Sequence, residues 1–401
     1  MALPGTVRSG AMSTSTRTRV IDDVLAEAVA AGAVPNVVAI AADREGIIYE
    51  GAVGPRAPGE TDTLDGDTPF RIMSMTKPVV TVAALQLSEQ LKLDIDAPVE
   101  EYCPEFAEVQ LLAGVQDGRP LLRPPARKVT VKQLITHTSG LGYWFWSADV
   151  LAWERAVGAP RPMSGLRAVL DAPLVFEPGT AFLYGHGTDW LGLVVEAVVG
   201  RRLDEAIAAI VTDPLDMTRT GFALNDRARA GLVPVHLRAP DGGWEPSEIE
   251  LPSRPEYVSG SRGLYSTPRD YLTFQRMLLA DGTAPNGATL LAPDTVRAMF
   301  SDQISPLTFP PDIPTADPDA ACSLNVGPAF TWGYGLLING EDQPARRRAR
   351  SGAWSGLFNT HFWVDPAAGL TGAIYTQALP FLAPAARELY QDFETAVYAS
   401  L

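Results

Sequence analysis

Hydrophobic positions recur first with a helical period and then with the short period of β-strands. Residues 19–35, RVIDDVLAEAVAAGAVP, predict an amphipathic helix that ends at Gly32. Two apolar, β-rich runs follow, NVVAIAA and GIIYEGAVG, and the turn DREG separates them. This pattern predicts a β-hairpin near the start of the chain.

The next patterns are helical and then return to strands. KPVVTVAALQLSEQL is mostly apolar and predicts a buried helix, and residues 91–290 carry mainly helical patterns that Pro/Gly loops interrupt. The closing stretch, APAARELYQDFETAVYASL, predicts a last helix. Strand patterns return before it, in FTWGYGLLING, GLFNTHFWVDP and GLTGAIYTQ.

Strands and helices at both ends with helices between them predict an α/β fold of the α+β type. Residues 17–90 and 291–401 would form one α/β domain made from the two ends of the chain. Residues 91–290 would form a mainly helical domain beside it. The Ser/Thr-rich residues 1–16 predict a mobile tail.

Composition narrows the range of partners. The formal net charge is −15 and the pI is about 4.7, which disfavours nucleic acid or an anionic membrane because phosphate binding needs clustered Lys and Arg. The first twenty residues lack the apolar core of a secretory signal and no run reaches membrane-spanning length, so we expect a cytoplasmic protein. Cys103 and Cys322 are expected to be reduced and structural. The oligomeric state does not follow from the residues.

The candidate chemistry centres on residues 70–80, FRIMSMTKPVV. Ser74 and Lys77 face the same way if they share a helical turn, and Pro78 places the helix start close to Ser74. A serine hydroxyl becomes a nucleophile beside a base, and lysine acts as that base when burial lowers its pKa. Taken alone, the S-x-x-K pattern favours an ordinary helix start, with an N-cap serine and a solvent-facing lysine.

Several linked motifs favour the catalytic interpretation. FRIMSMTKPVVTVAALQLSEQLKLDIDAPVEEYCPEF resembles the nucleophile region of serine β-lactamase-fold hydrolases, most closely the class C β-lactamase-like carboxylesterases called family VIII esterases. The resemblance covers roughly residues 20–401. It implies a β-lactamase/penicillin-binding-protein-like fold, with an antiparallel sheet flanked by helices, a mainly helical domain and an active site at their interface. The further motifs, in the family's order, are VTVKQLITHTSGLGY, FEPGTAFLYGHGTDWLGLVVEAVVG, DPLDMTRTGF and GLYSTPRDYLTFQRMLLADG.

The resemblance also implies roles for residues outside the Ser–Lys pair. Tyr184 in EPGTAFLYGHG matches the family's catalytic tyrosine, whose phenol moves a proton between serine, leaving group and water. His186 stands where β-lactamases usually carry asparagine, and it either hydrogen-bonds within the substrate site or packs there. The backbone N–H groups of Ser74 and Leu357 would form the oxyanion hole.

The segment Trp354, Ser355 and Gly356 resembles the W-G-G variant that the esterases carry in place of the Lys-Thr-Gly of β-lactamases. Losing that cation removes the partner of a β-lactam carboxylate, while a tryptophan offers apolar surface to an uncharged acyl or alcohol group. The nearby Arg346–Arg348 is expected to be a solvated loop. These residues indicate an esterase rather than a β-lactamase.

An aromatic cluster follows the motif THTSG, in which His137 is expected to order the loop. It either walls the acyl pocket and contacts substrate or anchors the loop against the helical domain. Its members are Tyr143, Trp144, Phe145 and Trp146.

These observations together predict a serine hydrolase that cleaves small-molecule, short-chain carboxylic esters through an acyl-enzyme. Ser74 would attack, and Lys77 and Tyr184 would transfer the protons. The alternatives are a β-lactamase, a D-amino-acid peptidase, an acyltransferase or a non-catalytic penicillin-binding-like sensor. No G-x-S-x-G elbow, HExxH, Cys/His cluster or P-loop occurs, so neither a metal nor a cofactor is expected.

Overall fold

The computed structural model describes residues 14–400. Its first helix, α1 (Thr14–Ala30), contains the predicted amphipathic helix but begins earlier. The predicted mobile tail, residues 1–16, lies outside the described residues except for positions 14–16, which belong to α1; its mobility stays a prediction. Extending an existing helix adds one hydrogen bond for each residue that is fixed, so a helix can continue beyond its amphipathic stretch.

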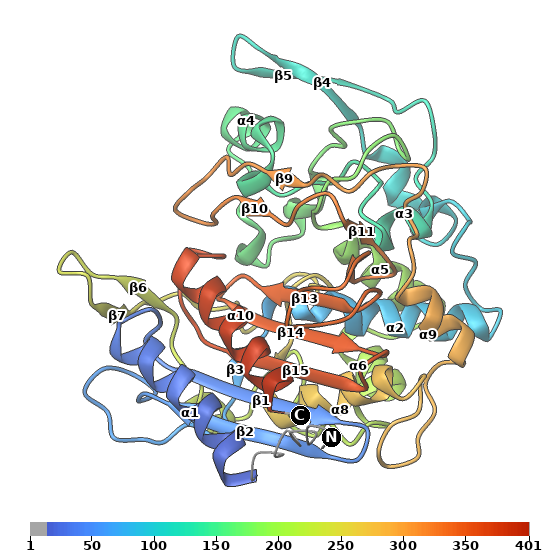
Figure 1. Ribbon diagram of the computed structural model, residues 1–401. Helices are drawn as coiled ribbons and strands as arrows, with labels where there is room; N and C mark the ends of the chain where they lie inside the picture. The colour runs from blue at the N-terminus through green and yellow to red at the C-terminus, as the bar shows by residue number, and fades with distance from the viewer. Residues whose placement is uncertain (1–13, 401) are drawn as a thin grey trace, which may run out of the picture.

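A seven-stranded antiparallel sheet fills the lower half of the view in Figure 1. Strands from the start and the end of the chain meet in it, since β1 pairs with β15 from Val38 opposite Tyr375 to Asp43 opposite Leu370. The predicted antiparallel sheet flanked by helices is therefore confirmed. In spatial order the strands are β11 (Phe330–Trp332), β12 (Leu337–Asn339), β13 (Gly352–Gly356), β14 (Thr360–Asp365), β15 (Leu370–Tyr375), β1 (Val37–Asp43) and β2 (Ile47–Val53).

The sheet is buried on both faces, as β1 illustrates. The odd-numbered side chains of residues 37–41 pack into a cluster with α1 and α10 (Pro384–Ala399). The even-numbered side chains of residues 38–42 join the main core, which includes α2 (Thr76–Glu89). Successive side chains of a strand point to opposite faces, so a run that is apolar at every position is buried from both sides.

Helix α8 (Pro268–Leu279) covers one face of the sheet, against β1, β14 and β15. Gln275 ties it there, because its Nε2 donates to Thr371 Oγ1 at 2.8 Å and to the Gly372 carbonyl oxygen at 3.1 Å. The predicted boundary at residue 290 would have placed α8 in the helical domain, and the packing does not follow that boundary. An amphipathic helix joins whichever apolar surface lies next to it, whatever its position in the chain.

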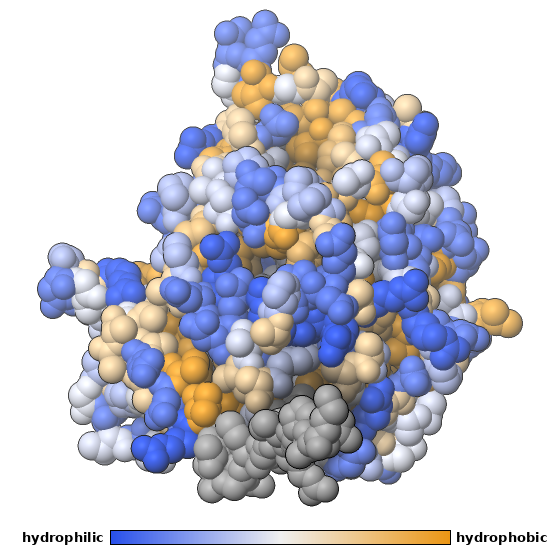
Figure 2. All heavy atoms as spheres, in the orientation of Figure 1, coloured by the Kyte–Doolittle hydropathy of each residue, from blue (hydrophilic) through white to orange (hydrophobic). Residues whose placement is uncertain are grey.

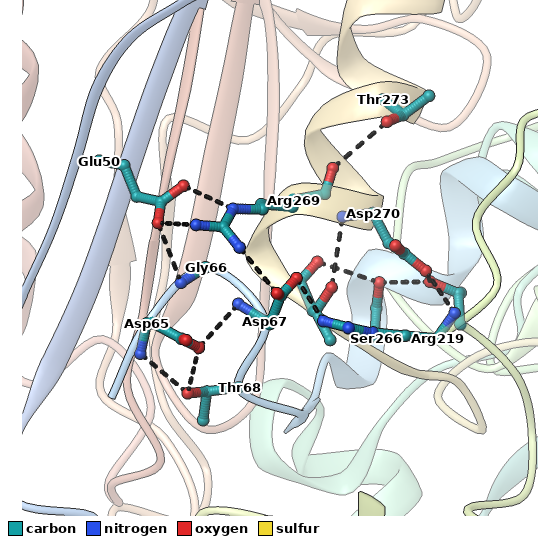
Figure 3. Close-up of polar contacts among 12 residues, drawn as sticks. Glu50, Asp65, Gly66, Asp67, Thr68, Arg219, Ser266, Arg269, Asp270 and Thr273 are labelled. Atoms are coloured by element: carbon teal, nitrogen blue, oxygen red, sulfur yellow. Dashed lines mark hydrogen bonds and ion pairs between the residues drawn. The ribbon is translucent and has the colours of Figure 1, made fainter. Parts of the chain in front are cut away.

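An ionic network holds the first turn of α8 in place (Figure 3). Arg269 donates to both carboxylate oxygens of Glu50 on β2, at 2.8 and 2.6 Å, and to Asp67 at 2.7 Å. The next residue, Asp270, accepts from the backbone N–H of Arg219 at 2.7 Å. Because a bidentate arginine–carboxylate pair fixes direction as well as distance, this network sets the orientation of α8 on the sheet.

The other half of the molecule is built from shorter helices and loops around α2 and α5 (Gly187–Val199). The remaining α-helices are α3 (Val131–Ile135), α4 (Ala148–Val157), α6 (Leu203–Ile207), α7 (Asp226–Ala230) and α9 (Pro293–Met299). The remaining strands form four pairs, β3 (Phe70–Arg71) with β8 (Tyr265–Ser266), β4 (Leu111–Gln116) with β5 (Arg119–Arg123), β6 (His236–Arg238) with β7 (Trp244–Pro246) and β9 (Asp312–Ile313) with β10 (Leu324–Asn325).

Hydrophilic residues predominate on the face drawn in Figure 2, with apolar residues scattered between them. Large exposed apolar side chains include Val115, Leu121 and Leu122 in the β4–β5 hairpin, which projects at the top of Figure 1. Within residues 14–400, no helix combines the length and the apolar character that a membrane span requires.

The segment Arg346–Arg348 differs from the solvated loop that the sequence predicted. Arg347 is only 7% exposed and donates to both carboxylate oxygens of Glu394, at 2.8 and 2.6 Å, and to the Tyr390 hydroxyl at 2.7 Å. Glu394 lies on α10 and is fully buried. The expectation is wrong at Arg347 because a carboxylate from a distant helix neutralises its charge inside the protein.

This buried pair yields a stability prediction. We expect Glu394→Ala to lower the free energy of unfolding by about 3–5 kcal/mol, because it leaves the Arg347 guanidinium buried without a counter-charge. The Arg347→Met/Glu394→Leu double variant removes both charges and is expected to lose much less. Urea unfolding followed by circular dichroism measures both. An equal loss in the two variants would contradict the assignment of the cost to an unpaired charge.

Candidate active site

Ser74 lies in a 3₁₀ turn that leads directly into α2. The preceding Met73 has a φ of +47°, a left-handed conformation that costs a non-glycine residue about 1–3 kcal/mol. Strand β13 packs closely against this turn. Position 356 on β13 requires glycine, because a Cβ at that position would overlap the Ile72 carbonyl oxygen. The predicted helix start close to Ser74 is confirmed, and the backbone is held in a strained form at the residue before the hydroxyl.

Lys77 is 1% exposed, and its amine contacts three oxygen atoms. Its Nζ lies 3.1 Å from Ser74 Oγ, 3.2 Å from Tyr143 OH and 3.0 Å from the Ser261 carbonyl oxygen. The prediction that Ser74 and Lys77 face one another across a helical turn is confirmed, and the lysine of an ordinary helix start would face solvent instead.

The electrostatic surroundings favour a neutral amine. Burial lowers the pKa of Lys77 well below its usual value; the nearby Asp189 opposes this effect and the charge of Arg262 adds to it. A neutral amine has two N–H groups and one lone pair. The Ser261 carbonyl and the Tyr143 hydroxyl accept the two N–H groups, which leaves the lone pair for the Ser74 hydroxyl proton. This arrangement suits a general base.

Tyr184 is 2% exposed, and its hydroxyl accepts a hydrogen bond from Trp354 Nε1 at 2.9 Å. Burial raises the pKa of Tyr184 well above its usual value, and the neighbouring Tyr143 raises it further. The side chains of Ser74 and Trp354 act in the opposite direction. The phenol is therefore protonated at neutral pH and suited to donate its proton.

His137 positions the segment that carries Tyr184. Its carbonyl accepts the Leu183 N–H at 2.9 Å, and its Nδ1 accepts the Gly185 N–H at 3.4 Å. Its ring centroid lies 4.6 Å from that of Tyr184. Burial holds the pKa of His137 well below its usual value, so the ring is neutral. Its contacts reach the segment of Tyr184, and the predicted ordering of its own loop stays a prediction.

A buried ion pair lies behind the Lys77 amine, and the sequence prediction missed it. Arg262 donates to Asp189 Oδ2 at 3.1 Å, and the Ser259 hydroxyl and the Ser261 N–H donate to Asp189 Oδ1 at 2.6 and 3.1 Å. Burial raises the pKa of Asp189, but Arg262 and Ser259 outweigh that effect and the pKa is lowered. An acidic residue within the otherwise apolar start of α5 was the available signal, because a buried charge needs a partner.

A small cleft of about 30 Å³ opens beside Ser74. Of the predicted site residues it brings together Ser74, Tyr143, Trp144, Tyr184, Ser355 and Leu357. Trp146 and Trp354 line a larger neighbouring cavity, which shares Ser355 with the cleft. Gly356 lines neither space. Leu357 lies at the cleft, where its backbone N–H is still a predicted oxyanion donor.

His186 does not line the cleft, although the sequence placed it among the substrate-binding residues. Its Nδ1 donates to the Gly142 carbonyl oxygen at 3.0 Å. Burial lowers the pKa of His186 to about 4, so the ring is neutral. Gly142 directly precedes Tyr143, whose hydroxyl contacts the Lys77 amine. The His186 contact therefore positions the loop that carries Tyr143. Of the two alternatives, the structure supports packing and loop positioning.

The aromatic run of residues 143–146 both lines the cavities and anchors its loop. Trp144 Nε1 donates to Asp317 at 2.8 Å, and Trp146 Nε1 donates to the Cys322 carbonyl oxygen at 3.1 Å. The anchoring contacts reach residues 317 and 322 and not the predicted helical domain of residues 91–290, and the role of these side chains as the wall of an acyl pocket stays a prediction. Trp354 was predicted only to offer apolar surface to substrate. It lines the larger cavity, and its indole N–H also donates to the Tyr184 hydroxyl.

Comparisons with known proteins show which family and structures the chain is similar to. The family model described as Beta-lactamase matches residues 21–397. Lovastatin esterase from Penicillium rubens is 31% identical, over 94% of this chain and 98% of its own. Monacolin J acid methylbutanoyltransferase from Aspergillus terreus is 30% identical, over 93% of this chain and 94% of its own. The structure of a mutant simvastatin synthase from Aspergillus terreus has a TM-score of 0.82 and 28% identity, covering 98% of this chain and 99% of its own.

The ion pair behind Lys77 predicts a pH effect. Arg262→Gln removes a cation and leaves Asp189 to raise the pKa of Lys77, so a higher pH is needed before the amine is neutral. We expect the pH midpoint for covalent labelling of Ser74 by a fluorophosphonate to move upward. The Asp189→Asn/Arg262→Gln variant removes both charges and should return the midpoint toward that of the wild type. Identical midpoints in all three proteins would contradict this account; the exposed Arg254→Gln is the control.

Proposed function

Because the chain belongs to the Beta-lactamase family, in which its relatives include an esterase and an acyltransferase, we propose that it is a serine hydrolase that cleaves carboxylic esters of short acyl chains. The single observation that carries the proposal is the buried Lys77 amine 3.1 Å from Ser74 Oγ. A base that is already neutral and aimed at a hydroxyl is what a serine nucleophile requires.

The acylation step follows from the contacts of these groups. Lys77 takes the Ser74 hydroxyl proton as Oγ attacks the ester carbonyl carbon, and the backbone N–H groups of Ser74 and Leu357 stabilise the resulting oxyanion. When the tetrahedral intermediate collapses, Tyr184 gives its proton to the departing alkoxide, which leaves as the alcohol. The Lys77 ammonium then returns a proton to the Tyr184 phenolate. The products are the alcohol and an acyl group bound to Ser74.

Deacylation uses the same groups in reverse. A water molecule attacks the acyl carbonyl carbon and gives a proton to Tyr184, while Tyr184 passes its own proton to the neutral Lys77 amine; Lys77 later returns that proton to Ser74 Oγ. The second intermediate then releases the carboxylic acid, and Ser74 Oγ regains its proton. Both half-reactions require Tyr184 to alternate between acid and base, which a phenol beside an amine permits.

Trp354 supports an ester rather than a β-lactam as substrate. It stands on β13 where the family's β-lactamases carry a cation, and its indole faces a cavity instead of offering a charge to a carboxylate. Its N–H also holds Tyr184 at 2.9 Å, so the same side chain links substrate choice to the proposed acid.

Acyl transfer is the second candidate function, and two observations favour it. One relative is named a methylbutanoyltransferase, and the cleft beside Ser74 is small and lined mainly by apolar residues, which limits access of water to an acyl-enzyme. In this alternative an alcohol replaces water as the acceptor of the acyl group, and every other step is unchanged.

The proton roles predict a leaving-group effect. We expect Ser74→Ala to abolish hydrolysis of p-nitrophenyl butyrate and ethyl butyrate. Tyr184→Phe should slow the hydrolysis of ethyl butyrate by about 10²–10⁴-fold. It should slow the hydrolysis of p-nitrophenyl butyrate much less, because p-nitrophenolate leaves without a proton. Tyr102→Phe, which removes a hydroxyl remote from the cleft, is the matched control. Equal losses with both esters would argue against Tyr184 as the acid, and full activity of Ser74→Ala would refute the nucleophile.

A substrate panel separates the candidate activities. We expect p-nitrophenyl acetate and butyrate to be turned over with a kcat/KM far above that of nitrocefin, because no cation on β13 is available for a lactam carboxylate. Comparable values would contradict the argument built on Trp354. Added alcohols test acyl transfer, since a transferase forms the new ester while a hydrolase releases mainly the acid, and mass spectrometry quantifies both products.

A further inference from the structure

A second cavity, of about 270 Å³, adjoins the cleft at the nucleophile. Ser355 and Phe381 line both spaces, so a substrate bound at Ser74 can extend past Ser355 into the larger one. The cleft itself is only about 30 Å³, which leaves the larger cavity to receive the part of an ester that is remote from the reacting carbonyl. Neither the family membership nor the proposed chemistry explains the charges that line it.

Two arginines that form no ion pair with a described residue line this cavity, and none of the lining residues is acidic. Arg346 and Arg387 are both partly buried, and within residues 14–400 neither guanidinium makes an ion pair or a side-chain hydrogen bond. Arg347, which also lines the cavity, is already neutralised by Glu394. The exposed Asp392 is a nearby carboxylate: burial and Glu388 raise its pKa, and the charge of Arg346 lowers it. The cavity therefore carries net positive charge in a protein whose formal net charge is −15.

The position of Arg387 also favours a negatively charged ligand in this cavity. It lies in the first turn of α10, where the helix dipole is positive, and that turn contains no acidic residue. A cation at this end of a helix is unfavourable, whereas a bound anion is favourable. The placement costs stability in the free protein, and the cost is offset when a negative group enters the cavity.

His361 provides an independent sign of a missing partner. It lines the same cavity and is 4% exposed, yet its Nε2 is buried and has no hydrogen-bond partner among the described residues. It stacks on Tyr390, with ring centroids 4.8 Å apart, and lies opposite Ser355 in the β13–β14 register. Burial and then the charge of Arg347 lower the pKa of His361 to about 3, so the ring is neutral. Buried polar atoms are rarely left unpaired, and a ligand oxygen would satisfy this one.

We infer that this cavity binds a carboxylate carried by the ester substrate, with Arg346 and Arg387 as its ionic partners and His361 donating a hydrogen bond to the same ligand. The inference rests on the proposed function, because it names the class of ester that the site prefers. Two guanidinium groups suit a planar carboxylate, and the acidic protein disfavours ligands of higher negative charge. Because Ser355 stands between the two spaces, the carboxylate lies several bonds from the ester carbonyl.

The first experiment compares matched esters with and without the carboxylate. The wild type is expected to prefer p-nitrophenyl hydrogen glutarate over p-nitrophenyl methyl glutarate, its neutral counterpart, by kcat/KM. The Arg346→Gln/Arg387→Gln variant should lower that ratio by about tenfold or more, since each arginine loses a charge-assisted hydrogen bond. Arg350→Gln, an exposed arginine of the same loop outside the cavity, is the control. A ratio that the double variant leaves unchanged, both in this pair and in the second pair described next, overturns the inference.

A second pair of esters shows whether the carboxylate that enters the cavity belongs to the acyl portion or to the alcohol portion of the substrate. p-Acetoxybenzoate carries it on the alcohol portion, and its methyl ester is the neutral counterpart, whereas the glutarate pair carries it on the acyl portion. An arginine-dependent preference in either pair supports the carboxylate site and identifies the portion that enters the cavity. Absence of the preference in both pairs overturns the inference.

A binding measurement separates this inference from the proposed function. Calorimetry of monomethyl glutarate with the Ser74→Ala variant is expected to show binding that weakens as NaCl is added and that weakens about tenfold or more when Arg346 and Arg387 are also replaced by Gln. If this arginine-dependent binding is found but the wild type hydrolyses no ester, the carboxylate site stands and the proposed function is refuted. Ester hydrolysis with no arginine-dependent binding would refute the site alone.

Discussion

The burial of one amine constrains the rest of the site. In water the Lys77 side chain would be charged at neutral pH and could not accept a proton from serine. The protein removes that amine from solvent and surrounds it with the Ser74 and Tyr143 hydroxyls and the Ser261 carbonyl. Burying a charged ammonium in this position would be costly, so the amine is held neutral and its hydrogen-bonding capacity is filled. A residue that is ordinarily a solvated cation is thus held in a form that can accept a proton.

The surrounding polar groups follow from that constraint. The charge of Arg262 disfavours an ammonium at Lys77, and Asp189 neutralises Arg262 so that the arginine can be buried. Trp354 supplies a hydrogen bond to the buried Tyr184 hydroxyl, and His137 fixes the segment on either side of it. The apolar cleft and the positively charged cavity beside it meet at β13, so one strand borders both the reacting centre and the region that would select the substrate.

Local patterns were sufficient for the fold class and for part of the site. Strand and helix periods at both ends of the chain predicted one α/β domain made from the two termini, and the family resemblance implied its antiparallel sheet. The spacing of Ser74 and Lys77 allowed a contact between them, and the resemblance favoured it over a solvent-facing lysine. Tyr184 came from linked motifs and a resemblance, and the match of residues 21–397 to the Beta-lactamase model confirms that resemblance to serine β-lactamase-fold hydrolases. The catalytic roles themselves stay predictions. These inferences succeeded because backbone geometry fixes spacing within an element.

The sequence by itself thus determined the elements, the family and the reactive pair on one helical turn. Tertiary structure alone decided which distant groups share a space. Asp189 meets Arg262 across 73 positions, and Trp354 meets Tyr184 across 170. It also turned His186 away from the cleft, buried Arg347 and set α8 on the sheet. Contacts of this kind depend on how whole elements pack against one another, and no local period or spacing records that packing.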